Sequence, residues 1–242
     1  MLTILFSPSE GKHPGGNTAL SHLLFGLQKR QLIFESYNNI VLNSDLASME
    51  KMFGIKNHDA FERYRKDLMT SPTCKAFERY DGVAYDYLDY ASLSKSAQSF
   101  LDTHCVIFSN LYGPILGGDL IADYKVKQGE AIGEIAPDAF YAKHFKSDLD
   151  AYFKDKELLD LRAGYYDKFY KPKQPYTTLK FIKGGKVVSH WAKAYRGIVL
   201  REIAKAGIDS LEHLMQLEIE TLHVKEIKEL TYKREIIFDI IS

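Results

Sequence analysis

The pattern of apolar and polar positions is most informative in the stretch Val187–Arg201. It begins with two β-branched residues, Val187 and Val188, which are typical of a central strand. Ser189 is a candidate N-cap for a helix that follows, and at 100° per residue this helix has an apolar and a basic side. The apolar side holds Trp191, Tyr195, Ile198, Val199, Ile203 and Ala206, and the basic side holds Lys193, Arg196, Gly197 and Arg201. The sequence therefore predicts a buried strand that runs directly into a basic amphipathic helix.

Gly197 falls in the middle of the basic side, where a glycine costs about 1 kcal/mol relative to alanine. Its position is explained if the backbone there closely approaches either a ligand or another element of the fold. A basic helix face is also typical of plain solvated surface. The spacing alone leaves both interpretations of this face open.

The rest of the chain predicts alternating strands and helices. Short apolar runs predict strands at Leu2–Ser7, Cys105–Phe108, Tyr124–Lys127, Leu158–Arg162 and Glu235–Ile241, and helical spacing predicts helices at Leu20–Tyr37, Leu93–Leu101, Asp138–Lys156 and Leu211–Leu217. Two further strands, Thr177–Ile182 and Lys186–His190, predict a hairpin across Gly184 and Gly185. Without a repeat or a clear linker, we expect residues 1–242 to form a single α/β (α+β) domain with a mixed β-sheet flanked by helices.

Glycine-rich loops follow two of the predicted strands. One is SPSEGKHPGGN, from Ser7 onward, and the other begins at Ser109. Ligands of α/β folds bind at the carboxyl ends of strands, so these loops and the basic helix predict one shared crevice. Its expected lining comprises Ser7, Ser9, Glu10, Lys12, Tyr112, Gly113 and Lys125. The first loop is not a P-loop, and taken alone it is more typical of an ordinary connection.

Residues 44–70 predict a small helical insertion. A first helix capped by Ser44 or Asp45, the turn at Gly54, and a second helix from about Asn57 resemble a helix-hairpin-helix module. In that module the hairpin amides and a nearby lysine hold a DNA phosphate without reading bases. The residues in question are Lys51, Phe53, Gly54, Ile55 and Lys56. An ordinary helical hairpin with a glycine C-cap is the alternative.

Composition narrows the class of protein. The 242 residues carry 32 basic and 32 acidic side chains, so any anion site must be a local patch. The two cysteines have no CxxC spacing and are expected to be reduced thiols of a cytosolic protein. Neither a signal peptide nor an apolar stretch of about 20 residues is present, which predicts a soluble, cytoplasmic protein. The eight histidines lack metal-ligand spacing, so no metal or cofactor is expected.

Several motifs occur in the order of a known family. They are Ser7-Pro8-Ser9-Glu10-Gly11-Lys12, Tyr80-Asp81-Gly82-Val83-Ala84-Tyr85, Ser109-Asn110-Leu111-Tyr112-Gly113, Asp119, Tyr124, Asp160-Leu161-Arg162-Ala163, and Ser189-His190-Trp191-Ala192-Lys193 with Arg196, Gly197 and Arg201. As an ordered set covering nearly the whole chain, they resemble the YaaA family (DUF328, formerly UPF0246), which is linked to the peroxide stress response of bacteria.

The resemblance implies a cytoplasmic protein that restrains free iron and protects DNA from oxidative damage. It also implies a helix-hairpin-helix element and a positively charged cleft for double-stranded DNA with low sequence specificity. The residues expected to contact DNA are then Lys12, Lys51, Phe53, Gly54, Ile55, Lys56, Lys193, Arg196, Gly197 and Arg201. Two departures make the cleft less positive: Leu116-Gly117-Gly118 replaces the Leu-Arg-Pro of many members, and the SPSEGK start places the Glu10 carboxylate beside the anion site. Lys125 replaces an arginine, which keeps the charge but loses the bidentate fork.

An enzyme acting on a nucleotide or nucleic acid is the alternative function. Polar groups at strand ends are typical of catalytic sites, and Glu10 with Lys12 or His190 is a candidate acid/base pair. No nucleophile elbow, metal-ligand set or dinucleotide fingerprint indicates which reaction this would be. Converging side chains in a deep pocket would favour the enzyme, and a shallow basic groove would favour DNA binding.

Overall fold

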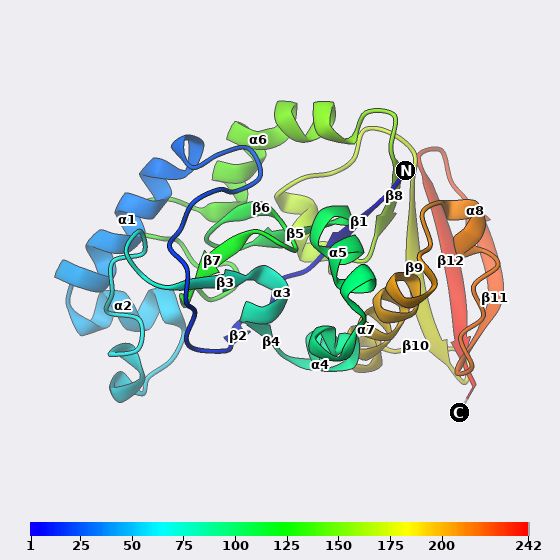
Figure 1. Ribbon diagram of the computed structural model, residues 1–242, viewed down its shortest axis with the longest axis horizontal. Coiled ribbons are helices and arrows are strands. Elements are labelled where there is room, and N and C mark those ends of the chain that lie inside the picture. Colours follow the sequence, from blue (N-terminus) through cyan, green and yellow to red (C-terminus); the bar gives the residue numbers. More distant parts are fainter. Residues whose placement is uncertain (242) are drawn as a thin grey trace.

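The main β-sheet contains eight strands in the order β11-β12-β9-β8-β1-β5-β6, with β10 paired to β9 (Figure 1). The computed structural model describes residues 1–241, except for the side chains of Ser189 and His190. The strands of this sheet are β1 (Leu2–Phe6), β5 (Cys105–Ser109), β6 (Gly113–Leu116), β8 (Glu157–Asp160), β9 (Tyr176–Lys183), β10 (Lys186–Val187), β11 (Leu222–Glu229) and β12 (Lys233–Ile240). From β12 to β5 neighbouring strands are parallel, while β6, β10 and β11 are antiparallel to theirs. The expected mixed sheet is confirmed.

Two small ribbons lie beside the main sheet. β2 (Gly11–Lys12) pairs with β4 (Tyr80–Asp81), and β3 (Thr73–Lys75) pairs with β7 (Leu120–Ala122). The first ribbon joins the loop after β1 to the segment that leads into α4. It therefore fixes two loops, distant in sequence, next to each other at one end of β1.

Helices flank the sheet, as expected. They are α1 (Gln31–Asn43), α2 (Leu46–Phe53), α3 (Ala76–Arg79), α4 (Val83–Leu88), α5 (Lys95–His104), α6 (Pro137–Phe153), α7 (Ser189–Ala206) and α8 (Leu211–Leu214), with 3-10 turns at Gln28–Arg30, His58–Phe61, Tyr90–Ser92 and Gly164–Lys168. Figure 1 shows α5 and α7 together in front of the sheet, and α7 contacts β9, α5 and α4. In the described part of the chain no helix is both long and apolar enough to cross a membrane.

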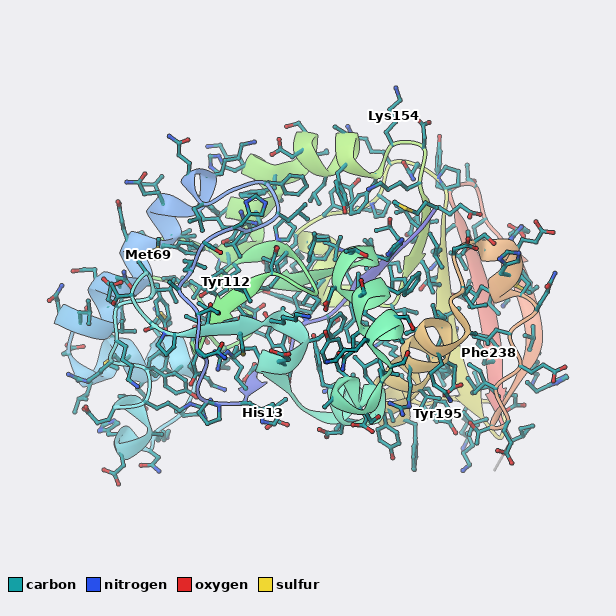
Figure 2. All side chains as sticks on the ribbon, viewed as in Figure 1. His13, Met69, Tyr112, Lys154, Tyr195 and Phe238 are labelled. Carbon is teal, nitrogen blue, oxygen red and sulfur yellow. The ribbon has the colours of Figure 1, made fainter. Side chains whose placement is uncertain are left out.

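The sheet forms because its central strands are uninterrupted apolar runs. All residues of β1 and β5 are buried, which is the pattern of parallel strands covered on both faces. Aromatic rings pack beneath the loops, where Tyr112, Tyr124 and Tyr80 are each at most 1% exposed. Figure 2 shows Tyr112 inside the molecule beside β6 and β7, and its hydroxyl accepts a hydrogen bond from the Ala122 amide at 3.0 Å.

Residues 44–70 contain both expected helices, but only the first is an α-helix. Asp45 caps α2 by accepting from the Ser48 amide at 2.8 Å, and α2 ends at Gly54, whose φ is +67°. The second predicted helix is a 3-10 helix, His58–Phe61. Beyond it, the Asp67 carboxylate accepts from the amides of residues 69 and 70. Such side-chain bonds replace the backbone bonds that a continuing helix needs.

Four other predicted elements differ in the structure. The helix expected at Leu20–Tyr37 starts only at residue 28, because Phe25 and Gly26 both have positive φ. Residues 124–127 are assigned to no strand and lie in the connection after β7. The strand expected to be buried at Val187 is a two-residue edge strand, and Val187 is 63% exposed. Ser189 is the first residue of α7, so the N-cap position belongs to Val188.

Candidate functional site

A pocket of about 390 Å³ lies at the carboxyl ends of β1 and β8. It is lined by residues 6–10, 82–85, 161 and 163, together with Gln128, Tyr166, Lys193 and Arg196. We call it the α7 pocket, after the helix that carries both cations. β1 and β8 are adjacent, and the chain continues from β1 toward β5 on one side and from β8 toward β9 on the other. This is the topological switch point at which open α/β sheets bind ligands.

Ser7 joins three walls of the α7 pocket. Its Oγ accepts a hydrogen bond from the Ala163 amide at 2.8 Å, which ties the loop after β1 to the loop after β8. Its carbonyl accepts from the Tyr85 hydroxyl at 2.8 Å, which ties the same loop to α4. Because the hydroxyl and the carbonyl of Ser7 are both used in this way, the residue supports the pocket's shape.

Gly82 allows the segment before α4 to pack closely against the loop after β1. The Ser9 hydroxyl donates to the carbonyl of Asp81, and Gly82 has a φ of +137°, a conformation that L side chains rarely adopt. A Cβ on Gly82 would also lie 2.6 Å from Ser9 Oγ. Residues 80–85 of the family-like motif therefore serve to bring the start of α4 against the β1 loop.

Two cations of α7, Lys193 and Arg196, line the pocket. Three residues apart, they lie on the same side of the helix. Among the side chains that the structure describes, neither forms a hydrogen bond or an ion pair. Burial lowers the pKa of Arg196, and the negative charge of Asp160 opposes that shift. An arginine stays protonated in proteins, so the pocket contains a half-buried positive charge without a partner, which is the requirement for binding an anion.

Asp160, the carboxylate whose charge acts on Arg196, forms an ion pair with another arginine, Arg162. Arg162 Nη2 lies 2.7 Å from one Asp160 carboxylate oxygen and Nε lies 2.9 Å from the other. The same guanidinium donates to the carbonyls of Tyr166 and Tyr170. Both side chains are almost completely buried. This ion pair fixes the chain after β8 and leaves Arg196 available to a ligand.

A charged cluster lies behind the rim of the pocket. Glu10 accepts from the Gln128 amide at 3.0 Å and lies 3.4 Å from Lys125 Nζ. Lys12 is buried beneath them, donates to the carbonyls of Ser9 and Glu10, and lies 3.9 Å from the centre of the Tyr124 ring. Burial, and then the nearby Lys125 charge, lowers the Lys12 pKa to about 7. Lys12 supports the loop after β1 from inside and is not part of the pocket lining.

The structure brings together five of the residues that the sequence placed in one crevice. Ser7, Ser9, Glu10, Lys193 and Arg196 all line the α7 pocket. They come from the loop after β1 and from α7, as the strand-end argument requires. The side chain of the other candidate catalytic residue, His190, lies outside the described side chains.

Tyr112 and Gly113, also expected in the crevice, belong to the core. Both are buried, and a Cβ on Gly113 would overlap the ring of Tyr141. The expectation for these two residues was wrong because β5 turns directly into β6, which carries the second loop inward. Lys125 lies beside the pocket, where its ion pair with Glu10 occupies it.

Two residues on the basic side of α7 have structural contacts instead of a free surface. Gly197 is buried, and a Cβ there would overlap the backbone carbonyl of Ala84. Of the two reasons for a glycine at this position, the close approach of another helix is the correct one. Arg201 donates to the carbonyls of Leu88 and Asp89 at 2.7 and 3.0 Å and to Ser92 Oγ. Arg201 therefore satisfies the free carbonyl groups at the carboxyl end of α4.

The turn after α2 forms a separate surface hollow, lined by Ala47, Glu50, Lys51, Gly54, Ile55, Lys56, Lys127 and Glu130. Lys51 and Lys56 are exposed, but two carboxylates share the hollow. Phe53 is fully buried against Phe61, so it anchors the turn and is inaccessible to DNA. The Lys127 side chain covers the position that a Cβ of Gly54 would occupy.

Two other residues of the pocket could not be selected from the sequence. Tyr166, in the 3-10 turn after β8, and Gln128, in a turn, line the pocket, but neither periodicity nor a motif marks them. Tyr85 and Ala163 did stand in family-like motifs, which was the available signal. In the part of the chain that the structure describes, no group of His, Cys, Asp and Glu side chains is arranged to hold a metal ion.

The fold and this pocket define an α/β protein with a pocket that carries two cations at the switch point of a mixed sheet. Residues 2–228 match the family described as peroxide stress protein YaaA, and the chain belongs to that family. An uncharacterized protein of Campylobacter jejuni is 40% identical over the full length of both chains. UPF0246 proteins of Malacoplasma penetrans and Corynebacterium glutamicum are 26% and 32% identical, covering 98% and 84% of this chain and 98% and 85% of their own lengths.

Proposed function

We propose that this chain acts in the cytoplasm during peroxide stress, where it binds double-stranded DNA through phosphate contacts and limits iron-dependent oxidative damage. Membership of the peroxide stress family supports the cellular role. The observation that carries the binding proposal is the pair Lys193 and Arg196. These cations lie on one side of α7 without a described partner, and unpaired basic groups are what a phosphate recruits.

The hairpin after α2 is the proposed second contact. Lys51 and Lys56 are exposed beside Gly54, and neither forms an ion pair within residues 1–241. Glu50 and Glu130 reduce the positive potential of this hollow. We therefore expect the hairpin to contribute less to DNA affinity than α7 does.

Fluorescence anisotropy with a labelled duplex and a labelled single strand tests the proposal. We expect binding that weakens as salt rises, with a log-log slope of about −0.9 for each duplex phosphate neutralised. Lys193→Glu should weaken binding strongly, and Gly54→Asp should weaken it less. Lys205→Glu is the matched control, because Lys205 lies on the same helix but pairs with Glu202 outside the pocket.

Each outcome has a definite meaning. Equal losses in Lys193→Glu and Lys205→Glu would show that only the net charge matters and that the pocket does not bind DNA. Binding that ignores salt, or that is absent for duplex DNA, would refute the proposal altogether.

An enzyme acting on a nucleotide is the second candidate function. The observation that favours it is the Glu10 carboxylate in the pocket lining, a candidate general acid or base. The Lys12 amine, whose pKa is about 7, lies buried behind the lining and sets the charge beside Glu10 near neutral pH. Incubation of the protein with nucleotides and short DNA, followed by phosphorus NMR, would reveal a product. Loss of that product in both Lys12→Met and Glu10→Gln would support catalysis, and unchanged substrates with the wild-type protein would exclude it for the compounds tried.

A further inference from the structure

We propose that the α7 pocket binds one nucleotide through its phosphomonoester group, either as a free nucleotide or at the end of a nucleic-acid strand. This inference rests on the proposed phosphate binding by Lys193 and Arg196. It goes further by naming the ligand that enters the pocket. Three properties of the site support it: its size, its charge and its apolar walls.

The size of the pocket excludes a double helix. Small-molecule pockets occupy about 300–1,000 Å³, and the α7 pocket, at about 390 Å³, falls at the lower end of that range. The β1 loop, the start of α4, Gln128, the β8 loop and α7 all contribute to its lining. A duplex is far too wide to enter such a space, so its backbone phosphates meet the exposed Lys193 from outside the pocket. A phosphate that reaches the half-buried Arg196 arrives on a single nucleotide or on a strand end.

The charge of the pocket matches a monoester better than the diester inside a strand. A phosphomonoester carries a charge of about −1.5 to −2 near pH 7, because its second pKa is about 6. Lys193 and Arg196 supply two positive charges that pair with none of the side chains the structure describes. The carboxylate in the lining, Glu10, is held by the Gln128 amide and Lys125. The Asp160 carboxylate behind Arg196 is held by Arg162, so neither acid needs one of the two pocket cations as its partner.

The remaining walls are apolar and rigid, as a base and sugar require. Phe6, Leu161, Tyr85 and Tyr166 supply them. The Tyr85 hydroxyl is bound to the Ser7 carbonyl at 2.8 Å and the Tyr166 hydroxyl to Asn110 Oδ1 at 3.3 Å. Because both hydroxyl groups are engaged, the rings are held in fixed positions. Aromatic rings accept any base, since every base has a π-face.

Isothermal titration calorimetry with 5′-dAMP, deoxyadenosine and inorganic phosphate tests the ligand directly. We expect 5′-dAMP to bind, and we expect the two fragments to bind about tenfold more weakly or worse, since each lacks half of the contacts. Lys193→Met and Arg196→Met should each weaken 5′-dAMP by about tenfold, whereas Lys205→Met should leave it unchanged. Lys193 is exposed, so its variant keeps the test valid even if Arg196→Met fails to fold.

Two further arms identify the source of the nucleotide and separate the two proposals. Single strands that differ only in a terminal phosphate should bind differently if the pocket takes a strand end, and equally if it takes only the free nucleotide. Salt-sensitive duplex binding with no 5′-dAMP binding and no effect of a terminal phosphate would overturn this inference and leave the proposed DNA binding intact. Binding of 5′-dAMP without any duplex binding would overturn the proposed DNA binding and leave the nucleotide inference intact.

Discussion

Gly197 on α7 lies directly against the backbone carbonyl of Ala84 on α4. The two helices therefore touch without a side chain between them, and this contact sets the position of Arg196 relative to the start of α4. Any larger residue at 197 must push the helices apart.

Gly197→Ala is expected to lower the free energy of unfolding by about 1–3 kcal/mol, because the added methyl overpacks this contact and outweighs the gain in helix propensity. Urea denaturation measures the change. Gly164→Ala is the control: no atom lies within 4 Å of its Cβ position, so a change within about 0.5 kcal/mol is expected. Equal stability of Gly197→Ala and wild type would contradict the tight contact.

Arg201→Met separates structural from ligand-binding arginines. Arg201 satisfies the carbonyls of Leu88 and Asp89, and losing charged hydrogen bonds of this kind costs about 1.5–3 kcal/mol. We expect that loss of stability, by thermal or urea denaturation, with unchanged affinity for DNA and 5′-dAMP. A variant that keeps its stability but loses affinity would instead place Arg201 in the binding site.

The ion pair behind the pocket offers a double-mutant test. Arg162→Met leaves Asp160 buried without its partner, and breaking a buried pair in this way costs about 3–5 kcal/mol. The double variant Asp160→Asn/Arg162→Met removes the stranded charge and should recover part of that loss. If the double variant is destabilised by the sum of the single effects, as urea denaturation would reveal, the two side chains do not depend on each other.

Lys12 should make stability depend on pH. Its pKa is lowered from 10.5 to about 7 on folding, so between these values the unfolded chain holds a proton that the folded chain lacks. Its contribution therefore increases stability as pH rises from about 7 toward 10, by at most about 1.4 kcal/mol per pH unit. Below about pH 7 the amine is protonated in both states, and this contribution is lost.

Urea denaturation between about pH 6 and 9 measures the effect as a slope. Lys12→Met should lose the rise contributed by this group, whatever the absolute effect of losing its two hydrogen bonds. Lys193→Met, which removes an exposed lysine, should keep the wild-type slope. Parallel slopes for wild type and Lys12→Met would show that the Lys12 pKa is not lowered on folding.

The sequence alone was sufficient to predict strands in which every residue is buried and helices whose N-cap bond is made by a neighbouring residue. β1 and β5 are fully buried runs of the kind that only a strand in the middle of a sheet produces. Asp45 begins α2 through its own hydrogen bond to Ser48. In both cases the element depends on residues close in the sequence or on a uniformly apolar environment. The pattern of apolar and capping residues was therefore enough to predict it.

Other elements depend on partners far along the chain. β11 was not predicted because all but its first residue are exposed and its pattern has no apolar face. In the site, Ser7 was predicted from its place after a strand and Arg196 from the basic side of its helix. Nothing local distinguishes Arg196, which pairs with no described side chain, from Arg201, which holds α4. Tyr166 reaches the pocket through the 3-10 turn after β8, a geometry that its neighbours in sequence do not indicate.

β11 also determines how this protein behaves at high concentration. As the outer strand of the sheet it exposes a row of backbone groups, and exposed edges are templates for aggregation. Its pairing with β12 is irregular between Val224 and Glu226, and charged residues occupy most positions after Val224. A bulge and lysines are two of the devices that natural sheets use against edge-to-edge pairing. The outer edge of β11 therefore disfavours pairing with a strand of a second molecule, which opposes aggregation of the folded chain.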